Sequence, residues 1–125
     1  MLSHLNKKIE VSIDHICSEL KLDQNIKLRC SELARILGPI AGGESGKHII
    51  PDSVANAVAC SLVSLAHEEL WRSRRITRHL PDRIIGKLYG LSSSAVVYNK
   101  RLINSEIEKN RAIKPSPSDE NLPIG

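Results

Sequence analysis

One stretch constrains the fold of this chain more than any other: residues 51 to 70, with the sequence PDSVANAVACSLVSLAHEEL. Its apolar and thiol side chains fall on every side of a helical wheel, and a helix that is apolar all round is buried on all sides. Asn56, Ser61 and Ser64 interrupt the apolar run, which excludes the roughly 20 continuous apolar residues of a membrane span. The high alanine content and the length argue against a strand. We therefore expect a central helix enclosed by other helices.

Four further helices are predicted around this segment from the spacing of apolar residues and from helix-capping and helix-breaking residues. Their expected ranges are 2–20, 23–37, 81–89 and 92–110. Asp23 and Ser92 are suitable N-caps, and Gly38 with Pro39 ends the second helix. The chain has no phenylalanine, so the core must consist of leucine, isoleucine, valine and alanine, with Trp71 as an added core residue. These features predict an all-α fold.

The length of 125 residues suffices for one domain with one core, which we assign to residues 1–110. Residues 111–125 contain three prolines and little to bury, so a disordered C-terminal tail is expected there.

No group of residues in the sequence indicates catalysis or metal binding. The three cysteines, Cys17, Cys30 and Cys60, form no C-x-x-C pair and fall on core-facing helix positions, so buried reduced thiols are expected. The five histidines have no metal-binding spacing, and no nucleophile is paired with a base. Residues 41–50 superficially resemble a phosphate-binding loop but lack its first glycine and its hydroxyl residue. We expect no enzyme, no cofactor, no metal and no small-molecule substrate.

Residues 84 to 96, with the sequence IIGKLYGLSSSAV, fit a helix-turn-helix pattern. Gly86 stands where the two helices would cross, Gly90 would supply the left-handed turn, and Leu91 would fill the space between the helices. Ser92 would cap the second helix, which enters the major groove in DNA-binding proteins of this kind. The residues expected to meet DNA on this helix are Ser92, Ser93, Ser94, Val97, Tyr98, Lys100 and Arg101.

Basic charge is concentrated in this motif and just before it. Residues 72–101 hold eight basic side chains and a single acid, a net charge of +7 within a chain of net charge +4. Neutralisation of phosphate dominates affinity for nucleic acid, so this excess favours DNA as the partner. The outward face of the last helix has a single arginine, so base readout is expected to be weak or indirect, through DNA shape. Phosphate contacts are expected from Lys87 and from the acid-free connector with Arg72, Arg74, Arg75 and Arg78.

The order of these elements resembles one cyclin-like repeat of transcription factor IIB and its archaeal counterpart, transcription factor B. The matching pieces are residues 11–37 for two amphipathic helices, residues 46–51 before an alanine-rich central helix, and residues 84–92 for the glycine-crossed pair. The similarity covers roughly residues 5–108 and is most like the second repeat. It implies a five-helix cyclin-like bundle around a buried helix. It also implies a transcription initiation module that contacts double-stranded promoter DNA, with TATA-binding protein and RNA polymerase as partners.

The chain departs from that family in having one repeat and no zinc ribbon. The resemblance therefore fits either a piece of a longer initiation factor or a free-standing relative. Nothing resembles a signal peptide or membrane anchor, so an intracellular location is expected, cytoplasmic in an archaeon or nuclear in a eukaryote. Two other functions stay open: a cyclin-like module that binds a partner protein, and a stand-alone dimeric helix-turn-helix regulator.

Overall fold

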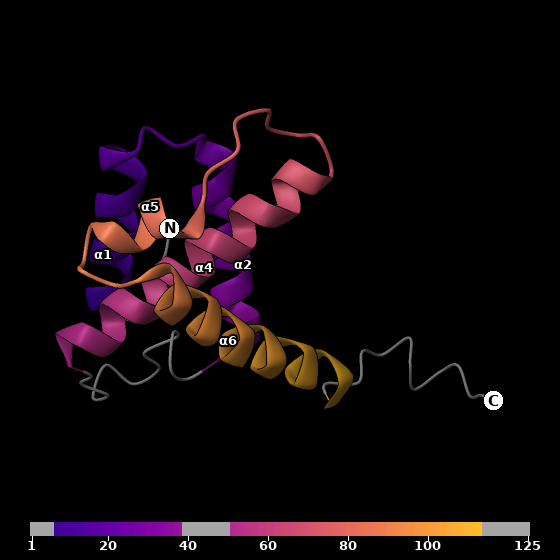
Figure 1. The fold of residues 1–125 in the computed structure, drawn as a ribbon. Coiled ribbons are helices and arrows are strands. Elements are labelled where there is room, and N and C mark those ends of the chain that lie inside the picture. Colours follow the sequence, from indigo (N-terminus) through magenta and orange to yellow (C-terminus); the bar gives the residue numbers. More distant parts are fainter. Residues whose placement is uncertain (1–6, 39–50, 114–125) are drawn as a thin grey trace.

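The computed structural model describes residues 7–38 and 51–113 (Figure 1). The described chain is all-helical, with no strand, and the predicted all-α fold is confirmed. The predictions for residues 2–6, for the glycine-rich loop at 41–50 and for the tail beyond residue 113 lie outside the described residues. The helices are α1 (Lys7–Glu19), α2 (Gln24–Leu37), α4 (Asp52–Arg72), α5 (Asp82–Lys87) and α6 (Ser93–Ile113).

The helix ends follow the capping chemistry of the sequence. The Asp23 carboxylate accepts a hydrogen bond from the Asn25 amide at 2.8 Å, which confirms the predicted N-cap of α2. Gly38 ends this helix with φ at +92°, in the left-handed half of the backbone map. The last helix continues to Ile113, so the first residues of the predicted tail are helical.

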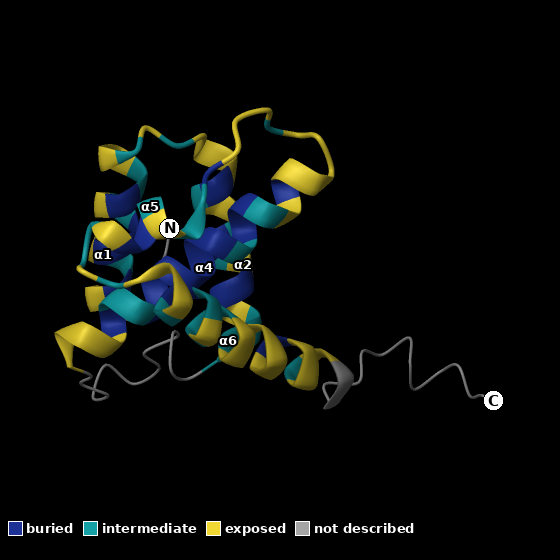
Figure 2. Cartoon of the chain, viewed as in Figure 1, coloured by how far each residue is buried: buried dark blue, intermediate teal, exposed yellow. Residues whose placement is uncertain are grey.

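The central helix α4 packs against α1, α2, α5 and α6, and the middle of its length is buried (Figure 2). Ala59, Leu62 and Val63 are completely buried. The prediction of an enclosed central helix is confirmed. Its two ends project beyond the neighbouring helices, and there Val54 and Trp71 are 40% and 41% exposed. The core position expected for Trp71 is therefore wrong.

Polar side chains inside α4 are paired rather than excluded from the core. The Ser61 hydroxyl donates to the Ala57 carbonyl at 2.8 Å within the helix. The imidazole Nε2 of His67, a residue only 4% exposed, lies 3.0 Å from the Arg78 carbonyl oxygen. Buried polar groups are tolerated when they are hydrogen-bonded. Ser61 is therefore satisfied within the helix, whereas His67 attaches α4 to the connector that follows it.

The surrounding helices bury the stripes that their spacing predicts. The fully buried residues of α1 include Ile9, Ile13 and Ile16. In α6 the inner face includes Ile103, which is half-buried, rather than Leu102, which is 50% exposed. No helix in the described ranges is long and apolar enough to cross a membrane.

Candidate nucleic-acid interface

The glycine at the crossing of α5 and α6 has no room for a side chain. Gly86 is buried, and a Cβ atom there would lie 2.6 Å from Cγ2 of Val96 and 2.7 Å from the Leu91 carbonyl oxygen. Distances this short are not sustained between packed atoms. The close approach expected at Gly86 is confirmed, and it fixes the two helices against each other.

The turn between the two helices has the backbone that the sequence predicts. Gly90 adopts φ of +71°, where a residue with a Cβ is strained. The amide of Leu91 then donates to the Gly86 carbonyl at 2.9 Å, which closes the turn. The Ser92 hydroxyl accepts from the Ala95 amide at 3.1 Å, so the predicted cap of α6 is confirmed. These bonds set the direction in which α6 leaves the turn.

The outward face of α6 carries most of the residues expected there. Ser93, Ser94, Tyr98 and Arg101 are exposed, and Val97 is half-buried at the edge of the same face. Tyr98 is the more open of the two exposed large hydrophobic residues on this helix, at 63% exposed. The face therefore offers two serine hydroxyls, one phenol and one guanidinium.

Lys100 does not join this face, and the expectation that it points outward is wrong. Its ammonium lies 3.0 Å from Oδ2 of Asp82 and 3.6 Å from Oε1 of Glu68, and its side chain is only 17% exposed. Asp82 also accepts from the Ser64 hydroxyl at 2.5 Å. Lys100, Asp82, Glu68 and Ser64 come from three helices, α4, α5 and α6. The Lys100 ammonium therefore links these helices instead of facing solvent. Removal of either partner would leave a partly buried charge unpaired, which is destabilising.

The connector arginines divide into paired and open side chains. Arg72 donates to Glu68, one helical turn earlier, at 2.8 Å, so it does have a local acid. Arg78 donates to the Leu20 carbonyl at 2.9 Å and attaches the connector to the turn between α1 and α2. Arg74 and Arg75 are exposed, and within the described chain their side chains have no hydrogen-bonding or ionic partner.

One basic residue of this region was absent from the expected site. Arg83 is exposed on α5, one helical turn before the exposed Lys87. The spacing of four residues on a short helix was the available signal, because it places both side chains on one face. Together with Arg101, these residues give three exposed cations on the α5–α6 pair. The one acid of this pair before Glu106 is Asp82, and its carboxylate already pairs with Lys100. We call Arg83, Lys87 and Arg101 the basic triad.

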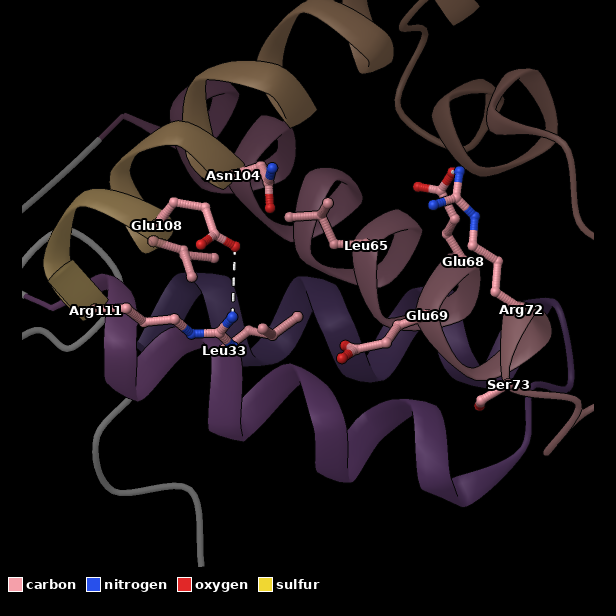
Figure 3. Close-up of a pocket in the computed structure, with 10 residues that line it drawn as sticks. Leu33, Leu65, Glu68, Glu69, Arg72, Ser73, Asn104, Glu108 and Arg111 are labelled. Carbon is pink, nitrogen blue, oxygen red and sulfur yellow. Dashed lines mark hydrogen bonds and ion pairs between the residues drawn. The ribbon is translucent and has the colours of Figure 1, made fainter. Parts of the chain in front are cut away.

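A separate groove of about 450 Å³ lies between α2, α4 and α6 (Figure 3). Leu33, Leu65 and Ile107 give it an apolar lining. Its rim holds ion pairs: Arg72 with Glu68, Arg111 with Glu108, and Arg29 with Glu69. Hydrogen bonds to Glu69, and to a second acid on α2, raise the pKa of Arg29 above its ordinary value. The groove therefore has an apolar interior, and the charged side chains at its rim pair with one another.

The three thiols are free, and their reactivity is suppressed by burial. Desolvation raises the pKa of Cys17 to about 11 and that of Cys60 to about 12, and it raises the pKa of Cys30 well above its ordinary value. The expected buried position is confirmed for Cys30 and Cys60, whereas Cys17 is half-buried. At neutral pH all three are protonated thiols, which are poor nucleophiles.

The raised thiol pKa values predict a loss of stability at high pH. The unfolded chain releases the Cys60 proton near its ordinary pKa of 9.0, whereas the folded chain holds it to about 12. The contribution of the protonated Cys60 thiol to the free energy of unfolding is therefore complete below pH 9. Above pH 9 it falls by up to about 1.4 kcal/mol per pH unit. Urea unfolding from pH 8 to 10.5 should show a steeper decline for the parent chain than for Cys60→Ala. Parallel declines would contradict the assignment.

The described chain contains no group of three or more metal-ligating side chains. It does contain the capped α5–turn–α6 pair, whose two helices carry the exposed cations of the basic triad. The connector with Arg74 and Arg75 is a second basic segment.

No protein-family model matches the chain, and comparisons with curated proteins and with solved structures found no significant match.

Proposed function

We propose that this protein binds double-stranded DNA as a transcription initiation module of the transcription factor IIB type, with α5, the turn and α6 acting as a helix-turn-helix. The observation that carries the proposal is the basic triad on a rigid, glycine-crossed helix pair. No exposed acid accompanies it on α5 or on α6 before Glu106. Neutralisation of phosphate supplies most of the affinity for DNA, so a cationic face without competing acids suits this partner.

The arrangement of the other helices supports the cyclin-like part of the proposal. A cyclin-like repeat consists of helices around one buried central helix, and α4 is enclosed by four others here. In this proposal promoter DNA lies against α6, with TATA-binding protein and RNA polymerase as further partners. The connector after α4 would contact phosphates through Arg74 and Arg75.

Base readout in this proposal is limited. Among the residues of α6 that are expected to meet DNA and are exposed, Arg101 is the one able to make the two-donor contact to guanine that dominates major-groove recognition. Ser93 and Ser94 accept or donate single hydrogen bonds and discriminate less. We therefore expect weak sequence preference and a strong dependence on ionic strength.

The first test is the salt dependence of binding to a duplex. Replacing the basic triad by glutamine (Arg83→Gln, Lys87→Gln, Arg101→Gln) removes three cations that are candidates for binding phosphate. The slope of log affinity against log salt concentration should become less negative by roughly 0.9 for each phosphate that is no longer neutralised. Fluorescence anisotropy with a labelled duplex at several salt concentrations measures the slope.

Lys109→Gln is the matched control, since Lys109 is an exposed cation farther along α6 that pairs with Glu106. It should leave the slope unchanged. A parent affinity that is the same at low and moderate salt, or an equal effect of the control and the triad variant, would contradict the DNA role.

A second function, binding of a partner protein, is favoured by two other surfaces. The groove between α2, α4 and α6 is lined by apolar residues, and Tyr98 and Leu102 are 63% and 50% exposed on α6. Exposed aromatic residues are enriched at protein interfaces. A protein partner that is retained by the triad variant, together with no DNA binding by the parent chain, would select this reading.

A further inference from the structure

The connector between α4 and α5 contains the single threonine of the chain. Thr77 follows Arg74 and Arg75 by three and two residues, in the sequence RRIT. No other hydroxyl residue of the sequence has arginine at both positions. Protein kinases select their substrates partly by such charge patterns next to the acceptor hydroxyl. The sequence around Thr77 therefore fits the charge preference of an arginine-directed kinase.

The structure makes this segment accessible. Residues 76–80 belong to no helix, and the connector arches away from the end of α4 before it returns to α5 (Figure 1). Arg74, Arg75 and Thr77 are all exposed. A segment outside any helix, with the side chains of Arg74, Arg75 and Thr77 exposed, can enter a kinase cleft without unfolding a helix. Ser73, by contrast, donates its hydroxyl to the Leu70 carbonyl at 3.1 Å and has no arginine two or three residues before it.

A pocket beside Thr77 has the chemistry to hold a phosphate. It has a volume of about 380 Å³ and lies between the connector and the turn joining α1 to α2. Its lining includes Lys21, Arg75, Thr77 and Arg78, with Asp23 as the one acid, beside apolar residues such as Leu22 and Ile76. Arg78 uses Nη1 to bind the Leu20 carbonyl, and its other N–H groups stay available. Guanidinium groups bind phosphate through paired hydrogen bonds, so the pocket suits a phosphothreonine.

We propose that Thr77 is phosphorylated by an arginine-directed protein kinase and that the cations of this pocket hold the phosphate. The Thr77 hydroxyl oxygen attacks the γ-phosphorus of a nucleoside triphosphate, and an oxygen–phosphorus bond forms. The bond from the γ-phosphorus to the bridging oxygen breaks and releases the nucleoside diphosphate. The hydroxyl proton passes to a base of the kinase.

The modification changes both the charge and the attachment of the connector. A phosphothreonine adds a charge of about −1.5 to −2 at neutral pH, which offsets most of the positive charge of Arg74 and Arg75. It also ties the connector to the turn between α1 and α2 through Lys21 and Arg78. Phosphorylation therefore weakens binding of DNA to the connector, a consequence that rests on the proposed function.

The test of the site uses the full chain, a purified arginine-directed kinase and ATP. Because Thr77 is the single threonine, any phosphothreonine in a hydrolysate reports this residue alone. We expect phosphothreonine in the parent chain, none in Thr77→Val, and a several-fold lower yield in Arg74→Gln with Arg75→Gln. A kinase that is active on a control peptide but yields only phosphoserine, or no phosphate, overturns the assignment.

Two further measurements test the consequences. The phosphorylated chain should melt at a higher temperature than the unmodified chain, and the gain should shrink in Lys21→Gln with Arg78→Gln. A lower melting temperature after phosphorylation overturns the role of the pocket.

Affinity for a duplex should fall about tenfold on phosphorylation at moderate salt. If phosphothreonine forms but the unmodified chain binds no DNA, the proposed function fails and the modification site stands.

Discussion

Replacing Gly86 by alanine is expected to lower the free energy of unfolding by about 3 kcal/mol, the upper part of the range for overpacking a core. The added Cβ would lie 2.6 Å from Cγ2 of Val96 and 2.7 Å from the carbonyl oxygen of Leu91. A change of rotamer can move the valine methyl, but the carbonyl belongs to the turn backbone. The two helices must therefore separate, which exposes core atoms on both of them.

Gly90→Ala is the matched comparison because it tests the backbone alone. A Cβ at this position has no heavy atom within 4 Å, but φ is +71°. We expect a loss of about 1–2 kcal/mol from the left-handed backbone, and a smaller loss for Gly90→Asn. Urea unfolding of the three variants gives the ranking. An equal or smaller loss for Gly86→Ala than for Gly90→Ala would show that the helices do not cross this closely.

The positions of the helices along the chain were predictable because they depend on patterns that are local in sequence. The all-round apolar segment forms α4, the apolar stripes form α1 and α2, and the caps Asp23 and Ser92 form their hydrogen bonds. Gly86 and Gly90 were recognisable because a tight crossing and a left-handed turn both require glycine. Each of these requirements acts within a few residues.

The burial of single side chains at the ends of helices was harder to predict. Trp71 lies near the end of α4, where neighbouring helices no longer cover it, and its ring packs on His79 at 4.6 Å between centroids. Periodicity gives the direction of a side chain around the helix axis but not how far the neighbouring helices extend. The same limit explains why Leu102 is exposed and Ile103 is half-buried.

Charged residues of the candidate site were predictable as a group but not one by one. The excess of positive charge after residue 71 predicts a basic segment. It could not distinguish Arg101, which is exposed, from Lys100, which pairs with acids from two other helices. Those partners are distant in the sequence, so the difference between the two neighbouring cations arises only when the helices pack.

The position of Lys100 predicts a large effect on stability. Asp82→Leu leaves the ammonium of Lys100 at 17% exposure without its partner at 3.0 Å, although Glu68 remains at 3.6 Å. Loss of one partner of a buried pair costs about 3–5 kcal/mol, and the partial exposure here reduces our expectation to about 2 kcal/mol. Lys100→Met should cost a similar amount because Asp82 then loses its cation.

The double variant Asp82→Leu with Lys100→Met removes both charges together. We expect it to be at least as stable as either single variant, because no unpaired charge is left at the helix junction. Arg72→Met provides the control, since it breaks a pair whose arginine side chain is 72% exposed. That change should cost less than about 1 kcal/mol. Additive losses in the double variant would show that the pair is not coupled.

The same variants separate a structural role of Lys100 from binding to DNA. Lys100→Met should lower the midpoint of urea unfolding and leave the salt slope of duplex binding unchanged, because its ammonium faces Asp82 and Glu68. Arg101→Ala should do the reverse, since its exposed side chain has no partner within the described chain. If Lys100→Met made the salt slope less negative by about 0.9 and left stability intact, Lys100 would face the phosphates, and the packing of α6 against α5 would be different.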